Sequence, residues 1–176
     1  FWRETKIWGG GSKLNKNHCC VRRSATEGIE FIHSRGLIHR DIKPANVMLL
    51  WLDDASVEPM VKLVDFGIAR FTQAFDIGVT MTESIGQVVG TAAYMSPEQC
   101  HGHDLDGRSD LYSLGVVVFE MLTGVLPFQG STPDLILKHL RELPRAPSYH
   151  EPTLPAEIDD LVLRLLAKDP TDRYGS

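Results

Sequence analysis

The sequence predicts an α+β fold that is mainly helical and contains one small β-hairpin. Three observations support this class. A helical pattern starts near residue 20, two short apolar runs follow at 46–50 and 61–66, and the second half of the chain holds three further helical segments. A chain of 176 residues is long enough for one domain with a substantial core.

The first 19 residues differ in composition from the rest of the chain. They contain two tryptophans, a glycine triplet and a basic, polar tail. The run "GGGSKL" matches neither the G-x-G-x-x-G nor the G-x-x-x-x-G-K-[ST] phosphate-binding pattern. We therefore expect residues 1–19 to be an unassigned, flexible segment.

The helical pattern that starts near residue 20 is followed by a stop signal. Val21, Ala25, Ile29 and Ile32 recur at helical spacing, which predicts one buried helix face. Gly36, in "HSRGLI", is expected to end the helix in the left-handed conformation.

The two apolar runs predict an antiparallel hairpin. "NVMLL" and "VKLVDF" are short, apolar and partly β-branched, and the acidic linker "WLDDASVEP" separates them. Residues 68–95 show little periodicity and many Gly, Thr and Ser residues, so we expect a long loop there. Long loops without regular structure are usually functional.

The helices of the second half are of two kinds. "DLYSLGVVVFEMLTG" is apolar on nearly every face, which is typical of a helix in the centre of a domain. "PDLILKHLREL" and "EIDDLVLRLLAKD" are amphipathic, and Asp134 and Glu157 fall near their starts, where the helix dipole favours acidic side chains.

Composition narrows the classes of function. The net charge of −5 does not suggest nucleic acid as a partner, and no run of about 18 apolar residues predicts a membrane span. The three cysteines, two of them adjacent, favour a reduced, cytoplasmic setting. The His/Cys groups at 18–20 and 100–103 lack the paired spacing of a zinc site, and we interpret them as scattered polar residues.

The stretch "HRDIKPANVML", residues 39–49, concentrates polar groups on one loop that leads into a strand. An aspartate such as Asp41 can accept a proton from an attacking hydroxyl. Lys43 can balance the charge of a phosphate, and the side-chain oxygen of Asn46 can bind a hard cation. A loop anchored by strands would keep these groups in fixed relation.

The "DFG" at the end of the second strand adds a carboxylate to this loop. Antiparallel pairing would bring Asp65 close to Asn46. One carboxylate and one amide oxygen are a suitable protein contribution to a magnesium site, because Mg²⁺ keeps waters and takes further oxygens from substrate phosphates. A lone "DFG" could equally be a solvated turn, but its order after "HRDIKPAN" is a much stronger signal.

Five motifs occur in a familiar order: "HRDIKPAN", "DFG", "GTAAYMSPEQ", "DGRSDLYSLG" and "DPTDRY". Together they resemble the eukaryotic-like protein kinases over residues 20–176. "HRDIKPAN" with Lys43 resembles the loop of the serine/threonine branch, since tyrosine kinases usually lack that lysine. "GTAAYMSPEQ" is especially similar to the same segment in bacterial members. The resemblance implies an incomplete protein kinase domain at 20–176, its large lobe. It also implies a serine/threonine kinase that transfers the γ-phosphate of ATP to protein hydroxyls.

The resemblance implies roles for individual residues of the site and the cofactors ATP and Mg²⁺. Asp41 corresponds to the catalytic base that orients the substrate hydroxyl, and Lys43 to the residue that contacts the transferred phosphate. Asn46 and Asp65 correspond to the magnesium ligands. Met48 would lie under the adenine ring.

The resemblance also implies a set of structural residues: His39, Phe66, Gly67, Glu98, Asp110 and Arg173. His39 and Phe66 would stack, and Gly67 would permit the "DFG" turn. Asp110 would accept backbone hydrogen bonds from the "HRD" loop. Glu98 and Arg173 would form a buried ion pair.

Regulation is implied at four further residues. Arg40 would bind a phosphate carried by the long loop, with Thr82 and Ser84 as the candidate acceptors. The bland alternative is that both are solvated hydroxyls. Thr91 resembles the threonine that bridges Asp41 and Lys43.

The chain departs from the family pattern before residue 20. A kinase small lobe carries a glycine-rich flap and a strand lysine, and residues 1–19 contain neither motif. We therefore expect the small lobe to be absent and activity of the chain alone to be doubtful. The alternative hypothesis is a non-catalytic kinase-like binding module or an inactive gene fragment. A membrane anchor is expected only in a longer parent protein.

Overall fold

A computed structural model describes residues 3–5, 28–51, 60–65 and 91–175. The strands are β1 (Arg3–Thr5), β2 (Val47–Trp51) and β3 (Met60–Leu63). The first helix includes residues 28–33. It is followed by α3 (Pro97–His101), α4 (Gly107–Thr123), α5 (Thr132–Arg141), α6 (Pro147–His150) and α7 (Ala156–Leu165), with 3₁₀ turns η1 (Pro44–Asn46) and η3 (Pro170–Asp172). The α+β class and the mainly helical content are confirmed.

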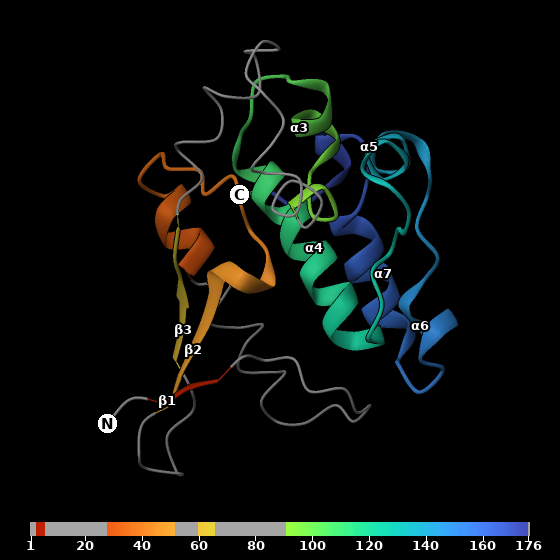
Figure 1. Cartoon of the computed structure of the whole chain (residues 1–176), viewed down its shortest axis with the longest axis horizontal. Helices are drawn as coiled ribbons and strands as arrows, with labels where there is room; N and C mark the ends of the chain where they lie inside the picture. Colours follow the sequence, from red (N-terminus) through yellow and green to blue (C-terminus); the bar gives the residue numbers. More distant parts are fainter. Residues whose placement is uncertain (1–2, 6–27, 52–59, 66–90, 176) are drawn as a thin grey trace.

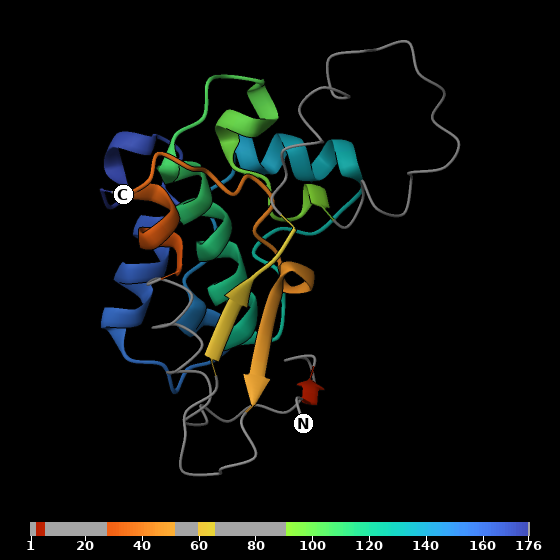
Figure 2. The ribbon, with the colours of Figure 1, turned by 90° about the vertical axis from the view of Figure 1, so that its left-hand side faces the viewer.

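The sheet and the helices form two parts that meet at α4. In Figures 1 and 2, α4 lies between the hairpin on one side and α7 on the other. The side chain of Leu63 on β3 packs against the cluster of buried side chains that α4 and α7 share. The hairpin is therefore attached to the centre of the helical part.

The first helix ends as the sequence predicts. Residues 28–33 are helical, and Ile29 and Ile32 are buried. The N–H of Leu37 donates to the carbonyl of Ile32 at 3.0 Å, and Gly36 adopts a left-handed φ of 70°. This is the glycine stop, since a side chain in that conformation would be strained. The earlier part of the predicted helix lies outside the described residues.

The predicted hairpin is confirmed. β2 and β3 are antiparallel, with a register that runs from Val47 opposite Leu63 to Leu50 opposite Met60. This register places the start of β2, where the polar loop ends, beside the end of β3, where "DFG" begins. Of the predicted linker "WLDDASVEP", Trp51 instead belongs to β2, and residues 52–59 lie outside the described residues.

β1 adds a third strand that the sequence did not predict. It pairs antiparallel with β2, from Arg3 opposite Trp51 to Thr5 opposite Leu49. These three residues fall in the segment that we expected to be flexible. Three residues are too few to show a strand period, and the pairing uses backbone groups that every sequence carries. Residues 6–19 lie outside the described part.

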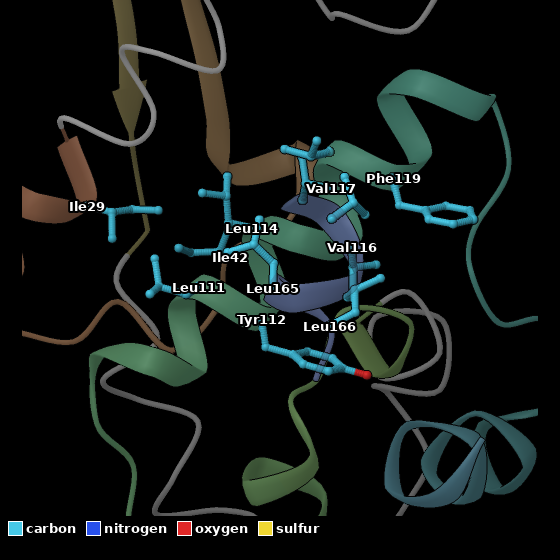
Figure 3. Close-up of a cluster of buried hydrophobic side chains, with 12 residues drawn as sticks. Ile29, Ile42, Leu111, Tyr112, Leu114, Val116, Val117, Phe119, Leu165 and Leu166 are labelled. Atoms are coloured by element: carbon cyan, nitrogen blue, oxygen red, sulfur yellow. The ribbon is translucent and has the colours of Figure 1, made fainter. Parts of the chain in front are cut away.

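The central helix α4 confirms the interpretation of its all-round apolar sequence. Every residue from Ser109 to Phe119 is buried. Asp106 caps its first turn by accepting a hydrogen bond from the N–H of Arg108 at 2.8 Å. α7 packs closely across it, because a Cβ at Gly115 would lie 2.8 Å from the Cβ of Leu165. Figure 3 shows α4 and α7 side chains together in this cluster.

A second, smaller cluster holds the segment that follows the long loop. Ala92, Ala93, Phe128 and Leu135 are buried together, so residues 91–95 pack against α5. The predicted loop at 68–95 differs here, because residues 91–94 form a helical turn. The rest of that loop, to residue 90, lies outside the described residues.

The two amphipathic helices of the second half are confirmed as α5 and α7, whereas α3 and α6 were not predicted. α3 and α6 are five and four residues long, too short for a periodic pattern. Nowhere in the described ranges does a helix combine the length and apolar character that crossing a membrane requires.

Candidate active site

The loop between the first helix and β2 folds back on itself. The turn η1 begins at Pro44, which suits the first position of a helical turn. It returns Asn46 to Asp41, where its Nδ2 donates to the Asp41 carboxylate at 2.9 Å and to the Asp41 carbonyl at 2.8 Å. Between them, Ile42 is buried in the main core and anchors the loop.

Asp41 also binds Lys43. The Lys43 Nζ lies 2.9 Å from Oδ2 and 3.2 Å from Oδ1 of Asp41. Asp41 is 8% exposed and Asn46 is 4% exposed, so the carboxylate lies in a largely dry setting with a cation and an amide beside it. Charge-assisted hydrogen bonds are strong in such surroundings.

Lys43 reaches a segment far along the chain. Its Nζ donates to the hydroxyl of Thr91 at 3.2 Å. The structure thus brings together Asp41, Lys43 and Thr91, as the resemblance implies. The loop at 39–46 and the 91–95 segment are joined at this lysine.

Asp110 clamps the backbone at the start of the loop. Its Oδ2 accepts the N–H of His39 at 2.7 Å, and its Oδ1 accepts the N–H of Arg40 at 2.8 Å. Gln99 donates through Nε2 to the Arg40 carbonyl at 2.8 Å. These bonds hold Arg40 at a φ of 69°, a left-handed conformation that non-glycine residues adopt rarely and that surrounding structure must stabilise.

Two of the residues around this clamp were missed at the level of sequence. Gln99 lies in the quoted motif "GTAAYMSPEQ" but carried no assignment. His33 donates through Nε2 to Asp110 at 2.9 Å, and its position one turn after Ile29 on the buried helix face was the available signal. Both act over long sequence separations.

His39 connects the loop to the strand that precedes Asp65. Its Nε2 lies 3.0 Å from the carbonyl of Val64, which can only accept, so Nε2 carries the proton. Its Nδ1 then accepts the N–H of Asp41 at 3.4 Å. The N–H of Val64 donates to the Asn46 carbonyl at 3.0 Å. The residue before Asp65 is thereby tied to both ends of the loop.

Asp65 lies next to this junction with an exposed side chain and a left-handed φ of 58°. The Nδ2 of Asn46 is engaged by Asp41, which leaves the Asn46 Oδ1 as the atom for a cation. A carboxylate and an amide oxygen are hard donors that fit Mg²⁺. In the described ranges, no group of three or more His, Cys, Asp or Glu side chains is arranged to hold a metal ion.

Several predicted residues cannot be placed in this geometry. Phe66, Gly67, Thr82 and Ser84 lie outside the described residues, and so does the predicted stacking of Phe66 on His39. Met48 is half-buried on β2.

Glu98 and Arg173 form a buried ion pair. The guanidinium contacts both Glu98 oxygens, at 2.6 and 3.0 Å, and Arg173 is 3% exposed. Burial alone would raise the pKa of Glu98, but the hydrogen bonds and charge of Arg173, with the Ser109 hydroxyl, outweigh it and the pKa is lowered. The pair joins α3 to the turn η3.

Comparison with known proteins decides the family. The family model described as "Protein kinase domain" matches residues 17–176. The chain belongs to the protein kinase family. This kinase chain is 47% identical over 151 residues to a probable serine/threonine-protein kinase of Streptomyces coelicolor, covering 85% of this chain and 21% of the relative.

Other relatives agree. The kinase chain is 46% identical over 155 residues to serine/threonine-protein kinase PknB of Mycobacterium tuberculosis, covering 88% of this chain and 23% of PknB. The crystal structure of the Mycobacterium tuberculosis PknI kinase domain superposes with a TM-score of 0.64 at 28% identity, covering 96% of this chain and 54% of that one. The chain thus spans about a fifth of the length of the curated relatives it matches.

Proposed function

We propose that this chain carries the catalytic centre of a serine/threonine protein kinase, which transfers the γ-phosphate of ATP to a protein hydroxyl. One observation carries the proposal. A largely buried aspartate, Asp41, is held by Lys43 and Asn46, and the Asn46 carbonyl accepts the N–H of Val64, the residue before Asp65. The names of the relatives, serine/threonine-protein kinases at 46–47% identity, support the same activity.

In this proposal Asp41 orients the substrate hydroxyl and accepts its proton as the hydroxyl oxygen bonds to the γ-phosphorus. The bond from that phosphorus to the bridging oxygen of ATP breaks, and ADP leaves. The Asn46 amide and the Lys43 ammonium keep the carboxylate pointed in one direction. Lys43 also supplies a positive charge beside the transferred phosphoryl group. Its contact with Thr91 keeps the ammonium from rotating into solvent.

The cofactors in the proposal are ATP, which the family uses, and Mg²⁺. The Asn46 Oδ1 and the Asp65 carboxylate would hold the metal, and Met48 would lie under the adenine. Bound there, Mg²⁺ would neutralise negative charge on the phosphate oxygens. His39 binds the carbonyl of Val64 and the N–H of Asp41, so it would keep Asp65, the residue after Val64, in fixed relation to Asp41.

The proposal extends to regulation and setting. Arg40, whose backbone is clamped by Asp110 and Gln99, would pair with a phosphate on Thr82 or Ser84, both of which stay predictions. We further propose that residues 20–176 act as the large lobe and that the domain works in the cytoplasm, where ATP is available.

The proposal is tested by transfer of labelled phosphate from γ-labelled ATP to a serine- and threonine-rich protein such as casein. The assay uses the chain and, where the gene encodes more, the whole gene product. We expect phosphoserine or phosphothreonine to form only with Mg²⁺ present, and Asp65→Ala to reduce transfer by about 10²-fold or more, since a metal ligand is lost.

The matched control is Asp104→Ala, which removes an exposed carboxylate outside the site and should leave transfer unchanged. No transfer by either preparation would contradict the proposal. That result would favour the alternative of a non-catalytic binding module.

A further inference from the structure

His139 on α5 is a buried polar residue that the proposed chemistry does not use. It is 0% exposed, and its ring packs edge-on against Phe128, with ring centroids 5.1 Å apart. A histidine buried this deeply must have partners for both ring nitrogens, because an unsatisfied buried polar atom is costly. Its partners lie on two other elements of the fold.

The hydrogen bonds of His139 have one consistent direction. Its Nε2 lies 3.1 Å from the carbonyl of Ala93, which can only accept, so Nε2 carries the proton. Its Nδ1 therefore accepts the hydroxyl proton of Tyr112, at 2.9 Å. The Tyr112 oxygen accepts in turn from the Lys168 Nζ at 3.3 Å. Each bond therefore has one donor and one acceptor: Lys168 donates to Tyr112, Tyr112 to His139, and His139 to the carbonyl of Ala93.

This chain of bonds requires a neutral imidazole, and the surroundings favour one. Burial, followed by the charge of Lys168, lowers the pKa of His139 to about 4. Tyr112 lies on α4 and is 0% exposed. In Figure 3 its ring lies at the end of the core cluster, with the hydroxyl oxygen on the side away from Ile29. Tyr112 of α4 therefore holds the ring of His139, and His139 in turn holds the carbonyl of Ala93.

Ala93 belongs to the turn that carries Thr91. The N–H of Tyr94 donates to the Thr91 carbonyl at 3.0 Å, which closes the turn around Ala92 and Ala93. Ser113 of α4 donates to the Tyr94 carbonyl at 2.8 Å. The Thr91 hydroxyl at the start of this turn accepts a hydrogen bond from the Lys43 ammonium. A shift of the Ala93 carbonyl would therefore move the hydroxyl that Lys43 contacts.

We propose that His139 is a positioning residue, which holds the Ala93 carbonyl so that the Thr91 hydroxyl meets Lys43 beside Asp41. It touches no reacting group and acts only through the 91–94 turn. This assignment deepens the proposed kinase function and rests on it for its catalytic consequence. Its structural part can be measured without any phosphate transfer.

The test compares three variants of the chain by amide hydrogen exchange and by kinase assay. His139→Leu removes both hydrogen bonds and leaves the Ala93 carbonyl without its donor. We expect the Tyr94 amide to exchange about tenfold faster or more, and kcat to fall about tenfold, with the KM for ATP changed less than threefold. His139→Gln, which can still donate to the Ala93 carbonyl, should recover most of both effects.

Val162→Ala is the stability control. Val162 is a buried residue of α7 and lies in the larger core cluster, which α7 shares with α4. When its loss in Tm equals that of His139→Leu, this variant should leave the Tyr94 amide better protected from exchange than the Leu166 amide. The Leu166 amide donates to the carbonyl of residue 162. It should also leave the ratio of kcat to KM nearly unchanged.

The outcomes separate the two proposals. Faster Tyr94 exchange in His139→Leu with no transfer even by the unaltered chain would support the positioning role and contradict the kinase activity. Normal transfer and full Tyr94 protection in His139→Leu would overturn the positioning role alone. Equal changes in Tyr94 exchange and in kcat for His139→Leu and Val162→Ala would show that His139 contributes only to stability. That result would also overturn the positioning role.

Discussion

Asp41→Asn is expected to reduce kcat for phosphate transfer by about 10²–10⁴-fold, the range that general acid–base groups contribute. The amide keeps the shape of the side chain but cannot take up the substrate proton. It also loses the charge that pairs with Lys43, which lies 2.9 Å away. The measurement is steady-state kinetics with saturating Mg²⁺ and ATP, alongside a thermal melt that establishes folding.

The control for this variant is Asp104→Asn, the same chemical change at an exposed position outside the site. We expect its kcat to match that of the unaltered chain. If Asp41→Asn kept more than about a tenth of the activity, Asp41 would not be the proton acceptor, and the assignment of the loop would be wrong.

Arg173→Met is expected to cause the largest loss of stability among single substitutions, roughly 3–5 kcal/mol, because it leaves the Glu98 carboxylate buried without its cation. The guanidinium also donates to the carbonyls of Ala167, Arg108 and Lys168, which would lose their donor. Arg173→Lys should recover only part of the loss, since an ammonium cannot reach all these acceptors. Urea denaturation measures the difference.

Arg108→Met provides a matched control, because Arg108 pairs with Asp106 at the surface, at 2.7 Å. Such exposed pairs contribute little to stability, because water and salt screen their charges. Similar losses for the two arginine variants would show that the buried pair is no more important than a surface one.

The buried pair of Glu98 and Arg173 also predicts that the stability of the chain depends on pH. The pKa of Glu98 is lowered in the folded chain from an ordinary value of 4.5. The stabilisation is therefore complete above that ordinary value and is lost as the pH falls through the lowered, folded value. Arg173→Met should show a weaker decrease in stability on acidification than the unaltered chain.

Much of the fold follows from patterns within short segments. The all-round apolar run predicted the buried α4, because only the domain centre can cover every face of a helix. The alternation of apolar runs and turn residues predicted β2 and β3, and their antiparallel register explains why Asn46 lies beside Val64. The loop at 39–46 was recognisable as a candidate site because its charged and amide side chains are concentrated in eight consecutive positions.

Other features depend on contacts that no local pattern encodes. β1 pairs through backbone groups, so its three residues carry no distinctive signal. The bond from Gln99 to the Arg40 carbonyl spans 59 positions, and that from His139 to Ala93 spans 46. A polar residue in a helical pattern does not reveal which distant carbonyl it will meet once the chain has folded.

Paramagnetic NMR with Mn²⁺ in place of Mg²⁺ tests the central claim most directly, that Asn46 and Asp65 share one divalent ion beside Asp41. With ATP present, we predict strong broadening of the Asn46 side-chain amide and of the Asp65 backbone amide. That broadening should disappear in Asp65→Ala. Broadening confined to exposed carboxylates such as Asp104, with the Asn46 amide unaffected, would contradict the account.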